Sequence, residues 1–160
     1  KHVVKMIVES AQMLSTAHRM LDGYMETRPS KSGKRMVKYY VHTDTYLEKN
    51  LYKAVHHYHP CTVWTCETNS NYNWHYKHFI ALCDEYTYRY GKRHKSQDVI
   101  EWCIIHKPSI VDNGFTEPAK AMPDEYKVDD VIQSYRNYYC GAKSGFANWK
   151  GRDIPEWYLV

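Results

Sequence analysis

This 160-residue sequence lacks several features that define common classes of protein. It contains no run of 18 apolar residues and no signal peptide at its start, so we expect no membrane contact and a cytoplasmic location. Its seven glycines are isolated, which excludes the glycine-rich loops that bind nucleotides in P-loop and Rossmann folds. Its five cysteines form no CxxC pair, which argues against a disulfide framework and a cysteine-based zinc site. No cofactor is expected from these patterns.

An initiating methionine is also missing, and the first residues already follow the pattern of a helix interior. We therefore expect a further segment ahead of Lys1. Any function that this segment carries lies outside the printed sequence.

Aromatic residues make up 15% of the chain, and 16 residues are Tyr. With 43% hydrophobic residues in all, the chain has enough apolar surface to fold as one domain. Its 22 Lys and Arg outnumber 18 Asp and Glu, which gives a formal net charge of +4. This modest excess permits binding to nucleic acid and does not require it.

Apolar residues recur at helical spacing through residues 4–21, which predicts a helix that ends near Asp22. A second pattern predicts a long helix from a cap at Ser70 or Asn71 to Gly91. Weaker patterns indicate a strand at 39–43, helices at 47–57, 96–106 and 130–141, and a loop at 108–125. We expect a mainly α fold, with residues 1–160 forming a single compact helical domain of four to five helices with long loops.

The opposite face of the first predicted helix is polar and basic around one carboxylate. It holds Lys5, Glu9 and Arg19, and His2 lies seven residues before Glu9, so these two side chains project in nearly the same direction. A solvated ion pair between Lys5 and Glu9 explains part of this pattern without any function.

Basic and aromatic residues alternate in three regions of the chain. The first is the segment 24–38, whose Pro29, Gly33 and many cations predict a mobile basic loop. Phosphate contacts and ring stacking are what nucleic-acid binding requires, although a solvated basic surface has the same composition. The candidate nucleic-acid-binding residues are Lys5, Lys34, Arg35, Arg89, Arg93, Lys150 and Arg152.

Several histidines also lie close together, at His56, His57 and His59 and again at His75 and His78. Neutral imidazoles are frequent metal ligands, but no HExxH or similar motif accompanies them. We therefore assign no metal site, and a metal-dependent hydrolase remains the weakest of the functional alternatives.

Three stretches, KHVVKMIVESAQMLSTAHRMLDG, NLYKAVHHYHPCTVW and FIALCDEYTYRYGK, resemble a group of short proteins encoded by tailed phages of marine bacteria. The likeness extends over nearly the whole chain. It implies a phage protein that works in the cytoplasm of the host cell.

A more distant resemblance is to the pyrimidine-dimer DNA glycosylase family, the phage endonuclease V type. It rests on the spacing of His2 and Glu9, on the HPxxxW motif of His59, Pro60 and Trp64, on EYTYRYG at residues 85–91, and on the aromatic pair at 157–158. The resemblance implies a compact helical domain that acts on damaged double-stranded DNA. It implies catalytic roles for Glu9 and His2 and a structural role for the HPxxxW motif.

The resemblance implies that the N-terminal α-amine of the chain, which we expect ahead of Lys1, attacks the sugar C1′ of a damaged pyrimidine nucleotide. The base leaves, a Schiff base forms, and a carboxylate assists strand cleavage. A DNA glycosylase/AP lyase is therefore the leading hypothesis for this chain. The alternative is a non-catalytic module that binds nucleic acid or a host protein through its basic aromatic surface.

Overall fold

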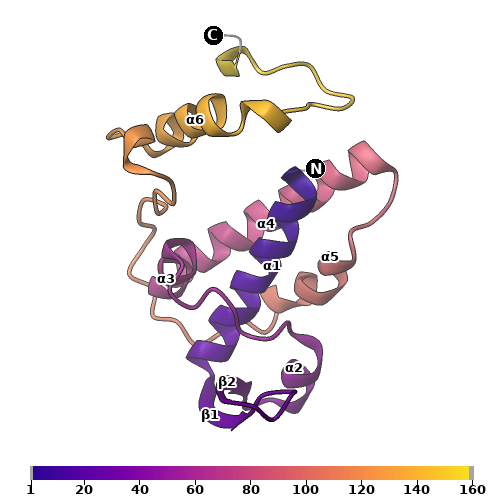
Figure 1. Ribbon diagram of the computed structural model, residues 1–160, viewed down its shortest axis with the longest axis vertical. Coiled ribbons are helices and arrows are strands. Elements are labelled where there is room, and N and C mark those ends of the chain that lie inside the picture. Colours follow the sequence, from indigo (N-terminus) through magenta and orange to yellow (C-terminus); the bar gives the residue numbers. More distant parts are fainter. Residues whose placement is uncertain (1, 159–160) are drawn as a thin grey trace.

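The computed structural model describes residues 2–158 as one mainly helical domain with a single two-stranded sheet. Figure 1 shows α1 and α4 crossing at the centre, with the sheet beside one end of α1 and α6 beside the other end. The principal elements in chain order are α1 (His2–Leu21), β1 (Gly23–Pro29), β2 (Met36–His42), α2 (Thr45–Asn50), α3 (Pro60–Glu67), α4 (Asn69–Tyr90), α5 (Lys95–Ile100) and α6 (Val131–Ala142). Four short 3-10 helices lie at Glu101–Ile104, Asp124–Tyr126, Ser144–Phe146 and Glu156–Tyr158.

The core forms where α1 packs against α4. Ile7, Ala11, Leu14 and Ala17 of α1 are fully buried, as their spacing of three and four residues predicts. They meet a buried aromatic stripe on α4 that includes Phe79, and α5 closes the core from the side. Packing of these stripes stabilises the helices far more than intrinsic propensity does.

Helix α4 begins and ends at clear capping residues. Thr68 is its N-cap and accepts a hydrogen bond from the Asn71 backbone N–H, so the predicted cap at Ser70 or Asn71 was wrong by a few residues. Gly91 ends the helix in the left-handed conformation, with φ of 65°, as expected for a glycine at this position.

The segment 24–38 is not the loop that its composition predicts. Most of it forms an antiparallel hairpin in which Gly23 pairs with His42 and Pro29 pairs with Met36, and only the tip between the strands is a turn. Half of each strand's backbone groups are satisfied by the other strand, so the cations here are held on a defined scaffold. The helix expected at 47–57 is also shorter, because α2 ends at Asn50.

The C-terminal layer, residues 124–158, packs over the N-terminal end of α1 and the C-terminal end of α4. The His2 ring contacts Tyr139 and Phe146, with ring centroids 5.6 and 5.3 Å away. At the end of α4, the Tyr88 hydroxyl donates to the Gly151 carbonyl at 2.7 Å. Figure 1 shows this layer, in orange and yellow, beside the N-terminus.

Among residues 2–158, no helix combines the length and the apolar character that crossing a membrane requires.

Candidate functional site

Glu9 and His2 lie on the first turns of α1, beneath the C-terminal layer. The Glu9 carboxylate is 3.2 Å from the Lys5 ammonium, and its side chain is 31% exposed. Burial against the aromatic layer and then the charge of Lys143 lower the pKa of His2, although the charge of Glu9 opposes this shift. A carboxylate, an amine and a neutral imidazole therefore share this end of the helix.

The HPxxxW motif builds the start of α3. His59 is the N-cap, and its Nδ1 accepts from the Cys61 backbone N–H at 3.2 Å, while Pro60 occupies the first helical turn. Trp64 is buried and donates its indole N–H to the Thr116 carbonyl at 3.2 Å. Each of the three residues thus has a defined packing or capping contact in this helix.

One buried cluster resembles a nucleophile with its base. Thr65 Oγ1 donates to the Cys61 carbonyl, so it accepts from His75 Nδ1 at 2.7 Å. His75 Nε2 is then left to accept from the Ser10 hydroxyl at 2.8 Å. Burial lowers the pKa of His75 to about 3, and Ser10 is only 3% exposed. These groups make their hydrogen bonds to one another within the core. They are too deeply buried for a substrate to reach them.

The structure does not bring the seven predicted nucleic-acid-binding residues together. Glu85 binds both Arg89 and Arg152, at 2.6 and 2.9 Å, and Arg93 pairs with Asp98 and Glu101. The Lys150 ammonium lies 4.4 Å from the centre of the Tyr90 ring, and Lys5 pairs with Glu9. Most of these cations therefore have partners within the chain, and only Lys34 and Arg35 line a groove.

That groove runs along the hairpin, and we call it the hairpin groove. It consists of two pockets, of about 470 and 600 Å³, which share Val37 and Tyr39. The first lies between β2 and the segment 53–57, and the second lies at the hairpin tip. The charged residues that line the two pockets are Arg28, Lys38, Lys53, Lys31, Lys34, Arg35 and one carboxylate, Glu48.

The hairpin groove holds more net positive charge than the whole chain. Three cations line each pocket, and with the single carboxylate the groove has a net charge of +5, against +4 for all 160 residues. The remainder of the sequence therefore carries a formal net charge of −1. An even distribution would give no such concentration of charge, although Arg28 also pairs with Glu26, which does not line the pockets.

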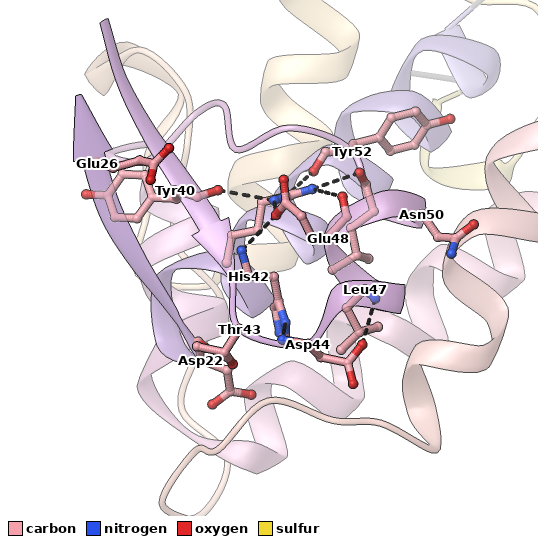
Figure 2. Close-up of polar contacts among 12 residues, drawn as sticks. Asp22, Glu26, Tyr40, His42, Thr43, Asp44, Leu47, Glu48, Asn50 and Tyr52 are labelled. Carbon is pink, nitrogen blue, oxygen red and sulfur yellow. Dashed lines mark hydrogen bonds and ion pairs between the residues drawn. The ribbon is translucent and has the colours of Figure 1, made fainter. Parts of the chain in front are cut away.

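The one carboxylate of the groove is bound by a buried guanidinium. Arg19, 3% exposed, pairs with Glu48 and also donates to the carbonyls of Tyr40, Glu48, Leu51 and Tyr52 at 2.7 to 3.1 Å. Figure 2 shows Tyr40, Glu48 and Tyr52 converging in this network. All five donors of the guanidinium have acceptors, so the charge that Glu48 brings to the groove is compensated from within.

The Glu48 carboxylate also accepts from the His42 backbone N–H at 2.8 Å. Burial works to raise the pKa of Glu48, but the bonds from His42 and Arg19 outweigh it and lower the pKa. Glu48 is therefore ionised at neutral pH and fixes β2 against α2.

Three half-buried rings lie among the exposed cations of the groove. The Tyr39 ring has Arg28 and Lys53 each 5.8 Å from its centre, and the Tyr40 and His57 rings are 4.9 Å apart. His57 Nε2 is buried and has no hydrogen-bond partner among the described residues. The groove thus combines cations and aromatic rings.

Sequence reasoning missed the rings and Lys53, whereas the other groove cations lie in the segment 24–38 that it recognised as basic. The signal was present, because SKSG between two runs of alternating residues is typical of a hairpin turn. His57 belonged to a predicted histidine cluster, yet it faces Tyr40, while His59 caps α3.

No three His, Cys, Asp or Glu side chains within residues 2–158 converge as metal ligands. Comparisons with protein-family models, with curated proteins and with solved structures found no significant match. The function is therefore argued from the geometry of this chain.

Proposed function

We propose that this protein binds nucleic acid through the hairpin groove. The observation that carries the proposal is the concentration of charge there, +5 in the groove against +4 for the whole chain. Exposed Lys and Arg side chains neutralise phosphates and release counterions, which supplies most of the affinity in such complexes. The half-buried rings add surfaces on which bases stack.

The binding test removes three groove cations together, as Lys34→Gln, Lys38→Gln and Lys53→Gln. A matched control removes Lys77, Lys95 and Lys107, which are exposed and do not line the groove. Fluorescence anisotropy with labelled single-stranded and duplex DNA is measured over a range of salt concentrations. Each lost phosphate contact lowers the slope of log affinity against log salt by about 0.7 to 0.9, so we expect a decrease of about 2 for the groove variant.

The control variant should bind like the unchanged protein. The proposal fails if neither form of DNA binds in a salt-dependent manner, or if the control and groove variants lose affinity equally. Equal losses would mean that overall charge, and no particular surface, attracts the DNA.

A second candidate is a DNA glycosylase/AP lyase that acts on damaged pyrimidines, as the resemblance to the endonuclease V type implies. The carboxylate that such chemistry needs would be Glu9, which lies 3.2 Å from the Lys5 ammonium on the helix that also carries His2. Arg19, which anchors the hairpin groove, lies ten residues after Glu9, about 15 Å along the helix axis. The two candidate sites are therefore separate.

Borohydride reduction tests this second candidate, because it converts a Schiff base between protein and sugar into a stable adduct. The protein is incubated with duplex DNA that contains a pyrimidine dimer or an abasic site. Glu9→Gln should abolish strand cleavage, and Glu117→Gln, an exposed carboxylate far along the chain, should not. The absence of any trapped adduct from the unchanged protein would refute the enzymatic proposal and leave the binding proposal intact.

A further inference from the structure

We propose that the hairpin groove selects single-stranded nucleic acid, with unstacked bases held against Tyr39 and against the Tyr40–His57 pair. This inference rests on the proposed binding function and adds the form of the ligand. It is argued from the arrangement of rings and cations along the groove.

The rings lie lower in the groove than the charges. Tyr39, Tyr40 and His57 are half-buried, whereas Arg28, Lys38 and Lys53 are exposed. A duplex presents its phosphates outward and keeps its bases stacked inside, so it would contact the exposed cations and leave the rings unused. A single strand brings both a phosphate and a free base face to the same place.

Tyr39 lies between the two sides of the groove. Arg28 reaches toward its ring from β1, and Lys53 reaches toward it from the segment after α2, each at 5.8 Å from the ring centre. A base stacked on this ring would have Lys53 beside one flanking phosphate and, beside the other, Arg28, which also pairs with Glu26. The volume of this pocket, about 470 Å³, falls within the range of about 300 to 1,000 Å³ that is usual for small-molecule sites.

His57 and Tyr40 form the second ring position, with their ring centroids 4.9 Å apart. The Nε2 atom of His57 is buried, so a base would meet the rings and not this nitrogen. The preceding residue, His56, has φ of 57°, which is uncommon for a residue with a side chain. Such strain clusters at binding sites, and here it occurs in the turn that presents His57 to Tyr40.

The groove continues from these rings to the hairpin tip through Val37 and Tyr39, which line both pockets. From Tyr40 back to Arg35 the strand extends for about 17 Å. Lys31, Lys34 and Arg35 at the tip are all exposed. A strand bound along this line would place its bases near the rings and its further phosphates at the tip.

The test compares three labelled ligands with the unchanged protein: single-stranded DNA, its duplex, and a single strand of the same length without bases. The first should bind about tenfold or more tightly than either of the others, since stacking is worth a factor of this order for each base. Tyr39→Leu should lose about tenfold for the single strand and little for the duplex. Tyr39→Trp should retain the single-strand preference, and Tyr46→Leu, an exposed ring outside the groove, is the matched control.

The outcomes separate the two proposals. If the duplex and the base-free strand bind as tightly as the single strand, the inference is wrong and the charge-based binding function remains. If no ligand binds, both are wrong. If Tyr39→Leu does not fold, the affinities of the unchanged protein for the single strand and for the base-free strand still show whether the bases contribute to binding.

Discussion

Arg19 is a buried charge whose five donors all have acceptors on three different parts of the chain. It links the end of α1 to β2, to α2 and to the segment after α2. Two of its partners, Tyr40 and Glu48, line the hairpin groove. The position of the groove walls therefore depends on this one side chain.

Replacing Arg19 with Met should lower the free energy of unfolding by about 3 kcal/mol or more, because four backbone carbonyls and the part-exposed Glu48 carboxylate lose their donor. Urea denaturation measures the change. Arg28→Gln, at an exposed ion pair with Glu26, should cost less than about 1 kcal/mol. A similar small effect for Arg19→Met would show that the network does not stabilise the fold.

Two buried histidines should make stability depend on pH. Burial, with smaller contributions from the charges of His42 and His106, lowers the pKa of His18 to about 4 against the opposing charge of Asp22. Burial, with smaller contributions from His78 and His59, lowers the pKa of His75 to about 3. The unfolded chain binds these protons near pH 6.5 and the folded chain does not. The contribution of the two neutral histidines to the free energy of unfolding is therefore fully present above pH 6.5 and decreases as the pH falls below it.

We expect the free energy of unfolding to be lower at pH 5 than at pH 8 by about 2 kcal/mol for each of these two histidines. Urea unfolding at the two pH values measures the loss, and His75→Gln should remove about half of it. His56→Asn, at an exposed histidine, should leave the loss unchanged. A free energy of unfolding that is constant from pH 8 to 5 would contradict this prediction.

Single residues also show what local patterns miss. Arg19 follows Lys5 and Glu9 on the polar face of α1, and nothing nearby in the sequence indicates that it is buried. Its acceptors lie 21 to 33 residues away, so only the tertiary fold brings them to the guanidinium. The rings of the groove were missed for the same reason, because Tyr40 and His57 come from separate segments.

At the scale of elements, the two longest helices were predicted, whereas of the hairpin only the strand expected at 39–43, which overlaps β2, was predicted. The apolar stripe of α1 and the capping of α4 by Gly91 follow from spacing alone, and the structure confirms both helices. The hairpin was taken for a loop because Pro29 and the cations outweighed the alternation in MVKYYVH. Pairing between strands, which local composition does not encode, decided the outcome.

The junction of α1 with the hairpin depends on Gly23. A Cβ atom there would overlap the carbonyl oxygens of Arg19 and Val41, both of which belong to backbone that cannot move independently. Gly23→Ala should therefore cost about 1 to 3 kcal/mol, as overpacking does in cores. Thermal unfolding measures the loss.

The matched control for this junction is Gly145→Ala, where nothing lies within 4 Å of an added Cβ. It should leave stability unchanged within about 0.5 kcal/mol. Equal melting temperatures for the two variants would show that the nearby carbonyl oxygens do not exclude a Cβ atom at residue 23.

At the scale of the whole molecule, Glu85 fastens the C-terminal layer to the helical core. It accepts from Arg89 within α4 and from Arg152 near the C-terminus, and the bonds from Arg152 and then Arg89 lower its pKa. Tyr88 and Tyr90 add contacts to Gly151 and Lys150. These contacts hold the layer at the C-terminal end of α4, in addition to those that His2 makes at the start of α1.

Glu85→Gln should loosen the C-terminal layer while the core stays folded. Limited trypsin digestion should then cleave several-fold faster after Lys150 and Arg152, with no comparable change in the urea midpoint of the core. Glu117→Gln, whose ion pair with Lys120 spans 4.0 Å at the surface, should digest at the original rate. Unchanged cleavage in Glu85→Gln would mean that other contacts fasten this layer.

The segregation of charge makes the molecule an electric dipole. With +5 in the hairpin groove and −1 over the remaining sequence, the field of a polyanion exerts a torque that turns the hairpin toward it during approach. On the proposed binding function, a protein with one such basic surface would coat a strand without crosslinking it to a second strand. Its complexes with long nucleic acids should then stay dispersed at stoichiometric protein, where a uniformly basic protein of this size would condense them.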